Sequence, residues 1–257
     1  MMQTDSVPPV ALVTGGAQRI GRAIALALAR DGWDIAVHFR QSQAPAAETV
    51  ADIRALGRRA HAVPCDLSKA DTLGALLDAC EQTLGPVRCL INNASLFEAD
   101  TATDFVPDRL EQHMRVNVAA PLALACALHA RLPAGTSGVV VNLLDQKLWN
   151  PNPDFLSYTL SKSALEAATG LLARALAPKV RVVGVAPGIT LPARGQTPSG
   201  FESAHRATPL GRASTPEDVA RAVVFLVNAQ AITGTSLLVD GGQHLVPSAR
   251  DILFLKS

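Results

Sequence analysis

One tyrosine and one lysine are spaced so that they could act together on a proton. Tyr158 and Lys162 lie four residues apart in the segment Y-T-L-S-K, which places both side chains on one face of a helix, about one turn from each other. A phenol has a pKa near ~10 and is a poor acid or base at neutral pH unless a neighbouring cation stabilises its phenolate. Lys162 can supply that cation, and Tyr158 is the only tyrosine in the chain. The same spacing also occurs by chance on exposed helices.

A glycine-rich turn, T-G-G-A-Q-R-I-G at residues 14–21, leads into the first expected helix. Gly15 and Gly16 permit positive φ and close backbone approach, and a helix N-terminus presents free N–H groups to a pyrophosphate. The turn therefore predicts a dinucleotide site that includes Gly15 and Ile20, with a purely structural turn as the alternative. Arg19 cannot take over the role that glycine has in forming such a turn. It is either a surface charge or a fork of donors for an anion or a substrate, and we favour the contact.

The second expected strand ends in H-F-R-Q-S, where an NAD enzyme places an acid to bind the ribose 2′-hydroxyl. His38, Arg40 and Ser42 instead offer a cation and hydrogen-bond donors. These groups fit a 2′-phosphate, so we predict NADPH rather than NADH. The alternative is that Arg40 is simply solvated.

These residues need a framework that brings strand ends together. Short β-branched runs alternate with Ala- and Leu-rich segments at helical spacing, without a linker, so we expect a single domain over 1–257. The order predicts an α/β Rossmann fold, a seven-stranded, mostly parallel sheet with helices on both faces. Ligands of such sheets bind beyond the carboxyl ends of the strands. The expected strands are 10–13, 35–39, 60–64, 89–92, 138–143, 181–185 and 237–239.

Composition excludes several classes of protein. The 257 residues carry 23 basic and 22 acidic side chains, a net charge of +1, so neither nucleic acid nor an anionic membrane surface is an expected partner. Apolar residues are 48% and aromatic residues 4%, which suits close-packed helices over a buried sheet. The four cysteines lack the spacing of a metal site or a disulfide framework, and no metal is predicted. With no signal peptide and no stretch of ~18 apolar residues, a cytoplasmic location is expected.

Taken in chain order, these motifs resemble the short-chain dehydrogenase/reductase family. The glycine turn resembles its T-G-x-x-x-G-x-G motif, with Arg19 at the middle glycine. Tyr158 and Lys162 match its catalytic pair. The resemblance implies a Rossmann fold, hydride transfer from a nicotinamide and usually a tetramer. Further matches are Asn93 and Ala94 in N-N-A, Asn117 in the proton-relay path, Pro187 and Gly188 beside the nicotinamide, and Asp66 with Leu67 near adenine, where Asp66 could equally be a helix N-cap.

The fourth catalytic position departs from the family. Most members carry serine about thirteen residues before the tyrosine, and this chain has Asp145 there. An ionised carboxylate would repel a developing oxyanion, so carbonyl reduction is disfavoured. A ring rich in N–H donors, by contrast, would hydrogen-bond favourably to the carboxylate. Desolvation could also raise the pKa of Asp145 and make it a proton donor. The alternative is a degenerate, inactive site.

Together with Arg19, H-F-R-Q-S and Asp145, the segment N-N-A-S-L-F resembles the pteridine reductase branch of the family. That resemblance implies hydride transfer from NADPH to a C=N carbon of a dihydropterin or dihydrofolate, with the proton delivered through Tyr158 or Asp145. Phe97 would stack on the pterin, or be an ordinary core residue, and Ser95 would bond the ring amino group or a phosphate. Lys162 would bind the nicotinamide ribose and hold Tyr158 acidic. Arg19 would contact the pyrophosphate and the pterin.

Two other functions stay open, a carbonyl reductase such as a 3-oxoacyl thioester reductase and a non-catalytic NADPH-binding protein.

Residues 190–209, rich in glycine and proline, are expected to form a substrate lid. Leu148, Trp149 and Pro151 are candidates for the pocket wall. The tail, 243–257, ends in an apolar I-L-F-L group and is expected at an oligomer interface, in line with a homotetramer.

Overall fold

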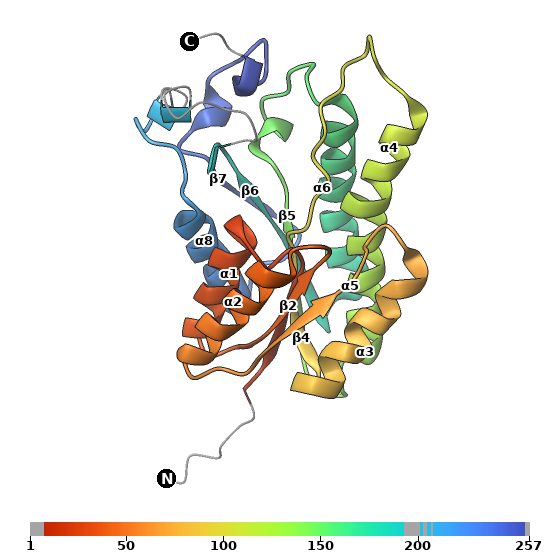
Figure 1. The fold of residues 1–257 in the computed structure, drawn as a ribbon. Helices are drawn as coiled ribbons and strands as arrows, with labels where there is room; N and C mark the ends of the chain where they lie inside the picture. Colours follow the sequence, from red (N-terminus) through yellow and green to blue (C-terminus); the bar gives the residue numbers. More distant parts are fainter. Residues whose placement is uncertain (1–7, 193–200, 203–204, 207, 255–257) are drawn as a thin grey trace.

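The computed structural model describes residues 8–192, 201–202, 205–206 and 208–254. Seven strands form one sheet in the order β3-β2-β1-β4-β5-β6-β7, and every neighbouring pair is parallel (Figure 1). The predicted α/β Rossmann fold is confirmed, with an all-parallel sheet where a mostly parallel one was expected. The strands are β1 (Val10–Val13), β2 (Asp34–Phe39), β3 (Ala60–Pro64), β4 (Val87–Asn92), β5 (Gly138–Leu143), β6 (Val180–Pro187) and β7 (Ser236–Val239).

Helices cover both faces of the sheet, which explains why the central strands are apolar without alternation. One apolar cluster packs α1, α2 and α8 on one face, and a second packs α3, α5 and α6 on the other (Figure 1). The short α4 continues through one π-helical turn, η2, into α5. The helices are α1 (Arg19–Arg30), α2 (Gln43–Ala55), α3 (Leu73–Leu84), α4 (Pro107–Met114), η2 (Arg115–Ala119), α5 (Ala120–Arg131), α6 (Leu156–Leu176) and α8 (Pro216–Asn228).

The sheet reverses its winding between β1 and β4, which lie side by side although they are far apart in sequence. In a doubly wound sheet this reversal opens a crevice beyond the carboxyl ends of the strands. The glycine turn after β1 and the N-N-A segment after β4 both end at this crevice. The topology therefore brings the two sequence motifs to one place.

All four cysteines are free thiols. Cys80 lies in the core, and burial raises the pKa of its thiol to about 12, so it stays protonated and unreactive. Cys126 is exposed and Cys65 is half-buried, so the thiols do not all sit inside the core. Among the described helices, none is long and apolar enough to cross a membrane. The same residues hold no group of three or more His, Cys, Asp or Glu side chains placed to bind a metal ion.

Candidate active site

Two adjoining pockets lie at the carboxyl ends of the strands, with volumes of about 750 and 540 Å³. We call them the reaction pocket, which contains Asp145 and Lys162, and the nucleotide pocket, which contains Arg40 and Asp66. Of the predicted catalytic, cofactor-binding and substrate residues, Asn117 alone lines neither pocket. The residues that line both are Arg19, Ile20, Asn93, Ser95, Phe97 and Tyr158.

The glycine turn is held open by contacts that a side chain would block. Gly15 has φ +62°, and a Cβ there would meet the Asn93 amide nitrogen at 3.1 Å. That amide, Nδ2 of Asn93, donates to the carbonyl oxygens of Thr14 at 2.9 Å and Gly15 at 3.2 Å. A Cβ on Gly21 would lie 2.1 Å from the Gly15 carbonyl oxygen, so α1 can start close to β1 only with glycine there. The turn leaves room for a ligand backbone or phosphate at the helix N-terminus.

Arg19 corrects one expectation, because its backbone takes the left-handed conformation of the turn with φ 55°. Sterics disfavour this conformation for a residue with a Cβ, and it costs on the order of 1–3 kcal/mol. The guanidinium is exposed, lines both pockets and donates to the Pro192 carbonyl oxygen at 3.1 Å. Arg19 therefore occupies the position of the family's middle glycine, and its positively charged guanidinium also lines both pockets.

His38 also differs from its expected role as a donor for a 2′-phosphate. Its Nδ1 accepts from the Gly15 backbone N–H at 3.0 Å, so Nε2 carries the proton and donates to the Cys65 carbonyl oxygen at 3.0 Å. The ring is only 3% exposed, and burial lowers its pKa. Both ring nitrogens are already bonded to backbone. His38 thus ties the glycine turn to the end of β3, and Arg40 and Ser42 are left as the cation and the donor at this edge.

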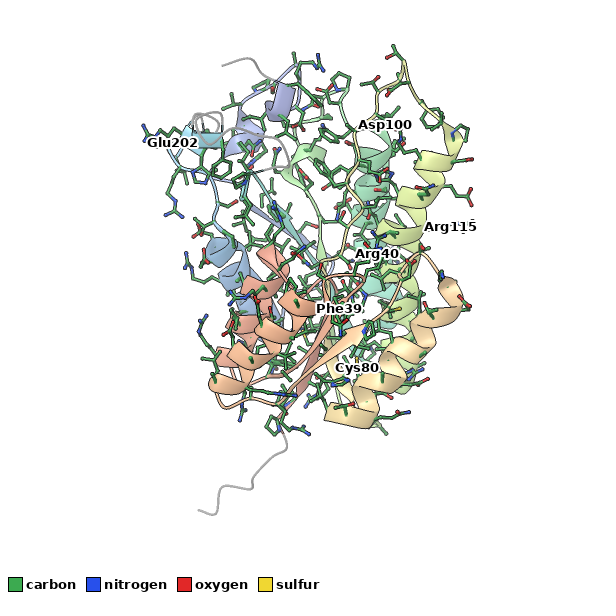
Figure 2. All side chains as sticks on the ribbon, viewed as in Figure 1. Phe39, Arg40, Cys80, Asp100, Arg115 and Glu202 are labelled. Atoms are coloured by element: carbon green, nitrogen blue, oxygen red, sulfur yellow. The ribbon has the colours of Figure 1, made fainter. Side chains whose placement is uncertain are left out.

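Arg40 lies immediately after β2, and its side chain is exposed beside the nucleotide pocket (Figure 2). Asp66 is the single acid among the described residues that line this pocket. Its Oδ1 accepts from the Ser68 hydroxyl at 2.8 Å and the Ser68 backbone N–H at 3.0 Å, and these bonds lower the pKa of Asp66. Asp66 therefore forms a local turn and does not cap the next helical segment, which starts at Ala70.

Asp145 and Tyr158 form a directly bonded pair. The Tyr158 hydroxyl donates to Oδ2 of Asp145 at 2.8 Å, and the Lys147 backbone N–H donates to Oδ1 at 2.9 Å. Burial raises the pKa of Asp145, although both hydrogen bonds oppose the shift. Burial and the Asp145 carboxyl raise the pKa of Tyr158 well above 10. The phenol therefore stays protonated, and the carboxyl is the stronger acid of the pair.

Lys162 lies beside this pair without bonding to the phenol. Its Nζ donates to the Leu143 carbonyl oxygen at 2.6 Å and lies 5.8 Å from the Tyr158 ring centroid. Burial lowers the pKa of Lys162 to about 8, while the Asp145 carboxyl opposes the shift. The shift in the pKa of Tyr158 comes from burial and from the Asp145 carboxyl, and the role of Lys162 in holding the phenol acidic stays a prediction.

Asn117 sits in the π-helical turn η2 and uses both ends of its amide on protein atoms. Its Nδ2 donates to the Leu96 carbonyl oxygen and to the Ser161 hydroxyl, each at 2.9 Å, and its Oδ1 accepts from the Leu96 N–H at 2.8 Å. The Ser95 hydroxyl lies 3.3 Å from the same Oδ1. Asn117 therefore positions the irregular segment after β4 against α6, and Ser95 in that segment is exposed and lines both pockets.

Phe97 is 47% exposed, so it is not an ordinary core residue. Its ring stacks on Phe155 with centroids 4.3 Å apart, and meets the Tyr158 ring edge-on at 4.7 Å. Phe155 was not identified from the sequence. It adopts φ 55° immediately before α6, and a strained residue at a pocket is the signal that could mark it, though only the structure reveals φ.

The start of α6 is capped by a residue far away in the chain. Asp100 is buried, and its carboxylate accepts from the Ser157 backbone N–H at 3.0 Å and from the Ser157 hydroxyl. Its backbone carbonyl accepts from the Leu156 N–H at 3.1 Å. A carboxylate at this end of a helix is favoured by the helix dipole. Asp100 thus fixes Tyr158, one residue further on, relative to the segment that carries Phe97.

Other expectations fall outside the pockets or outside the described chain. Leu148, Trp149 and Pro151 do not line the reaction pocket; Gln146 and Lys147 do. Of the expected lid, residues 193–200, 203–204 and 207 lie outside the described part of the chain. The tail, as far as it is described, contributes to the pocket, which the sequence did not predict; its lining residues are Gln243, Asp251, Ile252, Leu253 and Phe254.

With the crevice, the glycine turn and the tyrosine–lysine helix in place, comparison with known proteins defines the class. A family model described as enoyl-(acyl carrier protein) reductase matches residues 15–244. The chain belongs to the short-chain dehydrogenase/reductase family and is an oxidoreductase.

Three relatives are similar to this chain over nearly its whole length. The crystal structure of FolM alternative dihydrofolate reductase 1 from Brucella canis, complexed with NADP, is 40% identical, covers 93% of this chain and 95% of its own, and has a TM-score of 0.87. Pteridine reductase 1 of Leishmania tarentolae is 33% identical over 95% of this chain and 99% of its own. A putative ketoacyl reductase of the granaticin polyketide synthase of Streptomyces violaceoruber is 34% identical over 95% of this chain and 100% of its own.

Proposed function

We propose that this chain is an NADPH-dependent reductase of a C=N bond in a pterin, converting a dihydropterin or dihydrofolate to its tetrahydro form. The observation that carries the proposal is the Asp145–Tyr158 pair, in which a carboxyl takes the place of the family serine and is bonded to the phenol at 2.8 Å. The similarity to a dihydrofolate reductase and a pteridine reductase supports the same substrate class. A ketoacyl reductase is the alternative that the comparisons also support.

The nucleotide pocket fits NADPH. The turn at Gly15 and the N-terminus of α1 would take the pyrophosphate, and Asn93 and Ala94, which pack directly against Gly15, line the same pocket. Arg40 and Ser42 would bind the 2′-phosphate at the end of β2, with Asp66 and Leu67 beside the adenine. Pro187 and Gly188, at the end of β6, line the reaction pocket, where the nicotinamide would lie. When bound, NADPH supplies the hydride.

The reaction pocket fits a flat, nitrogen-rich ring. Phe97 offers an exposed aromatic face between the two pockets, so it can stack on a heteroaromatic substrate. Arg19 and Ser95, both exposed at the junction of the pockets, would bond the substrate or a phosphate. When it is ionised, a carboxyl facing this space accepts ring N–H donors and disfavours the oxyanion that develops when a ketone is reduced.

The hydrogen-bonded Asp145–Tyr158 pair would supply the proton for the ring nitrogen. When the C=N carbon gains a hydride, the electron pair of the π bond moves to nitrogen, which then takes up a proton. Asp145 is the stronger acid, and its raised pKa keeps it protonated to higher pH than an ordinary carboxyl. Tyr158 can hand on its own proton only as it receives one from Asp145, so we treat the two groups as one donor. Lys162 would bind the nicotinamide ribose.

We also propose that the protein acts as a homotetramer in the cytoplasm. Exposed apolar side chains on α6 and α8, Leu160, Leu171 and Phe225, are available for such contacts.

The cofactor preference gives a sharp test at Arg40. Replacing Arg40 with alanine should raise the Kd for NADPH about 10- to 100-fold and leave the Kd for NADH unchanged, because only the 2′-phosphate loses a charge-assisted bond. Cofactor fluorescence titration measures both constants. Arg30→Ala, at the exposed end of α1, is the matched control and should change neither. Equal losses for the two cofactors in Arg40→Ala contradict the assignment.

The substrate class is tested by NADPH oxidation. We expect turnover with dihydrobiopterin, dihydromonapterin or dihydrofolate and little with a 3-oxoacyl thioester. Clear reduction of the thioester with no pterin turnover favours the carbonyl reductase. No turnover with either, alongside tight NADPH binding, favours a non-catalytic binding protein.

A further inference from the structure

After β7, the chain crosses back over the reaction pocket. Gln243 lines the pocket, and its Oε1 accepts from the Ile189 N–H at 3.0 Å. Further on, residues 251–254 line the same pocket on the side that holds Phe155 and Lys147. This segment belongs to the same chain, so the pocket already has this wall within one protomer.

Two ion pairs hold the segment in place. Lys147 Nζ donates to Oδ2 of Asp251 at 3.1 Å, and Lys147 is only 3% exposed. Arg250 Nε donates to Oδ2 of Asp154 at 2.8 Å, and Asp154 is buried. The same Oδ2 accepts from the Asp251 backbone N–H at 2.7 Å. A buried ammonium is tolerated only with a partner, so the position of Lys147 depends on Asp251.

A series of aromatic contacts links the segment to the catalytic tyrosine. Phe254 stacks on Phe155 with centroids 5.6 Å apart, Phe155 stacks on Phe97, and Phe97 meets Tyr158 edge-on. Lys147 Nζ also lies 5.3 Å from the Phe155 ring centroid. Phe254, the last described residue of the tail, thus contacts Phe97, the proposed stacking surface for the pterin, through the single intervening ring of Phe155.

We propose that the C-terminal clasp, formed by Lys147, Asp154, Arg250, Asp251 and Phe254, determines substrate specificity by fixing the wall that contacts the substrate side chain. In naming a pterin as the substrate, this inference rests on the proposed function. Asp251 and Phe254 act as positioning and specificity residues, since neither touches the reacting atoms of the Asp145–Tyr158 pair. The charge of Asp251 also contributes to the raised pKa of Asp145, which supports its closeness to the site.

The experiment compares two variants, Phe254→Ala and the double variant Lys147→Met/Asp251→Leu, which removes both charges together so that none is left buried alone. Asp78→Asn is the matched control, because it breaks the surface ion pair with Arg131 far from the pocket. The probes are biopterin and folic acid, which share the pterin ring and differ in the side chain. Their Kd values for the NADP-loaded enzyme are measured by calorimetry, with the Kd for NADP alongside.

We expect the ratio of the two pterin Kd values to change about tenfold in both variants, while the Kd for NADP and the control stay unchanged. A purely structural role would weaken both pterins in the same proportion, and that result, or an unchanged ratio, overturns the proposal. If the wild-type enzyme binds neither pterin, the proposed function fails. The clasp is then tested with two 3-oxoacyl thioesters of different acyl length, whose ratio of kcat/KM must shift in the variants, and a constant ratio overturns it.

Discussion

Replacing Asp145 with serine should lower kcat/KM for a dihydropterin about 10²- to 10⁴-fold, the range that a positioned general acid contributes. The substitution removes the acid that is bonded to the Tyr158 hydroxyl and restores the hydroxyl found in most of the family. At a pH above the pKa of Asp145, the same variant should gain activity on a ketone, because no carboxylate then opposes a developing oxyanion. Steady-state NADPH oxidation with both substrates measures the two effects.

Asp145→Asn is the companion variant, since it keeps the shape of the side chain and cannot donate a carboxyl proton. We expect it to lose pterin reduction as Asp145→Ser does, and also to gain activity on ketones, because its amide carries no negative charge. Pterin turnover at the wild-type rate in either variant would refute the role of this carboxyl.

The pH profile of the wild-type enzyme also tests the assignment of Asp145 as the proton donor. An acid must be protonated to donate, so kcat/KM for a pterin should fall as the pH rises through the pKa of Asp145, which burial has raised. A further fall is expected near pH 8, where Lys162, with its pKa lowered to about 8, loses its charge. The first fall should be absent from the residual activity of Asp145→Asn, and the second should remain. A variant profile that keeps both falls would assign the first to another group.

Tyr158→Phe should reduce pterin turnover by a similar factor, about 10²- to 10⁴-fold. Removal of the hydroxyl breaks the 2.8 Å bond and leaves Oδ2 of Asp145 without its phenol donor. Because the two groups act as one donor, the double variant Asp145→Asn/Tyr158→Phe should be hardly worse than either single variant. Single-turnover kinetics at saturating NADPH separate this chemical effect from binding.

Ser163→Ala provides the control for Tyr158→Phe, since it removes a hydroxyl from the exposed side of the same helix. Its turnover and thermal unfolding should match those of the wild type. Multiplicative losses in the double variant would mean that Asp145 and Tyr158 act independently.

Much of the fold could be predicted from the sequence, because its signals are local. The apolar runs at β1 and β5 are buried along their full length, as expected for strands covered on both faces. The turn at Gly15 and the helical spacing of Tyr158 and Lys162 predicted the crevice and its contents. The right-handed crossover rule then left few ways to order the strands.

What could not be predicted depends on contacts between distant parts of the chain. His38 looked like a phosphate donor until the structure showed both ring nitrogens bonded to Gly15 and Cys65. The pKa of Tyr158 depends on how deeply the ring is buried, which residue spacing does not report. Asp251 reaches Lys147 across more than a hundred residues, and no periodicity in the tail marks that contact.

The central claim is that hydride from NADPH reaches a pterin carbon, and isotope transfer tests it most directly. The enzyme is incubated with dihydrobiopterin and NADPH deuterated at its transferable position, and the pterin product is analysed by mass spectrometry. We predict a tetrahydropterin that carries one deuterium on carbon, formed by the wild-type protein and about 10²- to 10⁴-fold more slowly by Asp145→Ser. Recovery of unlabelled dihydropterin, while a 3-oxoacyl thioester incorporates the deuterium, would contradict the account.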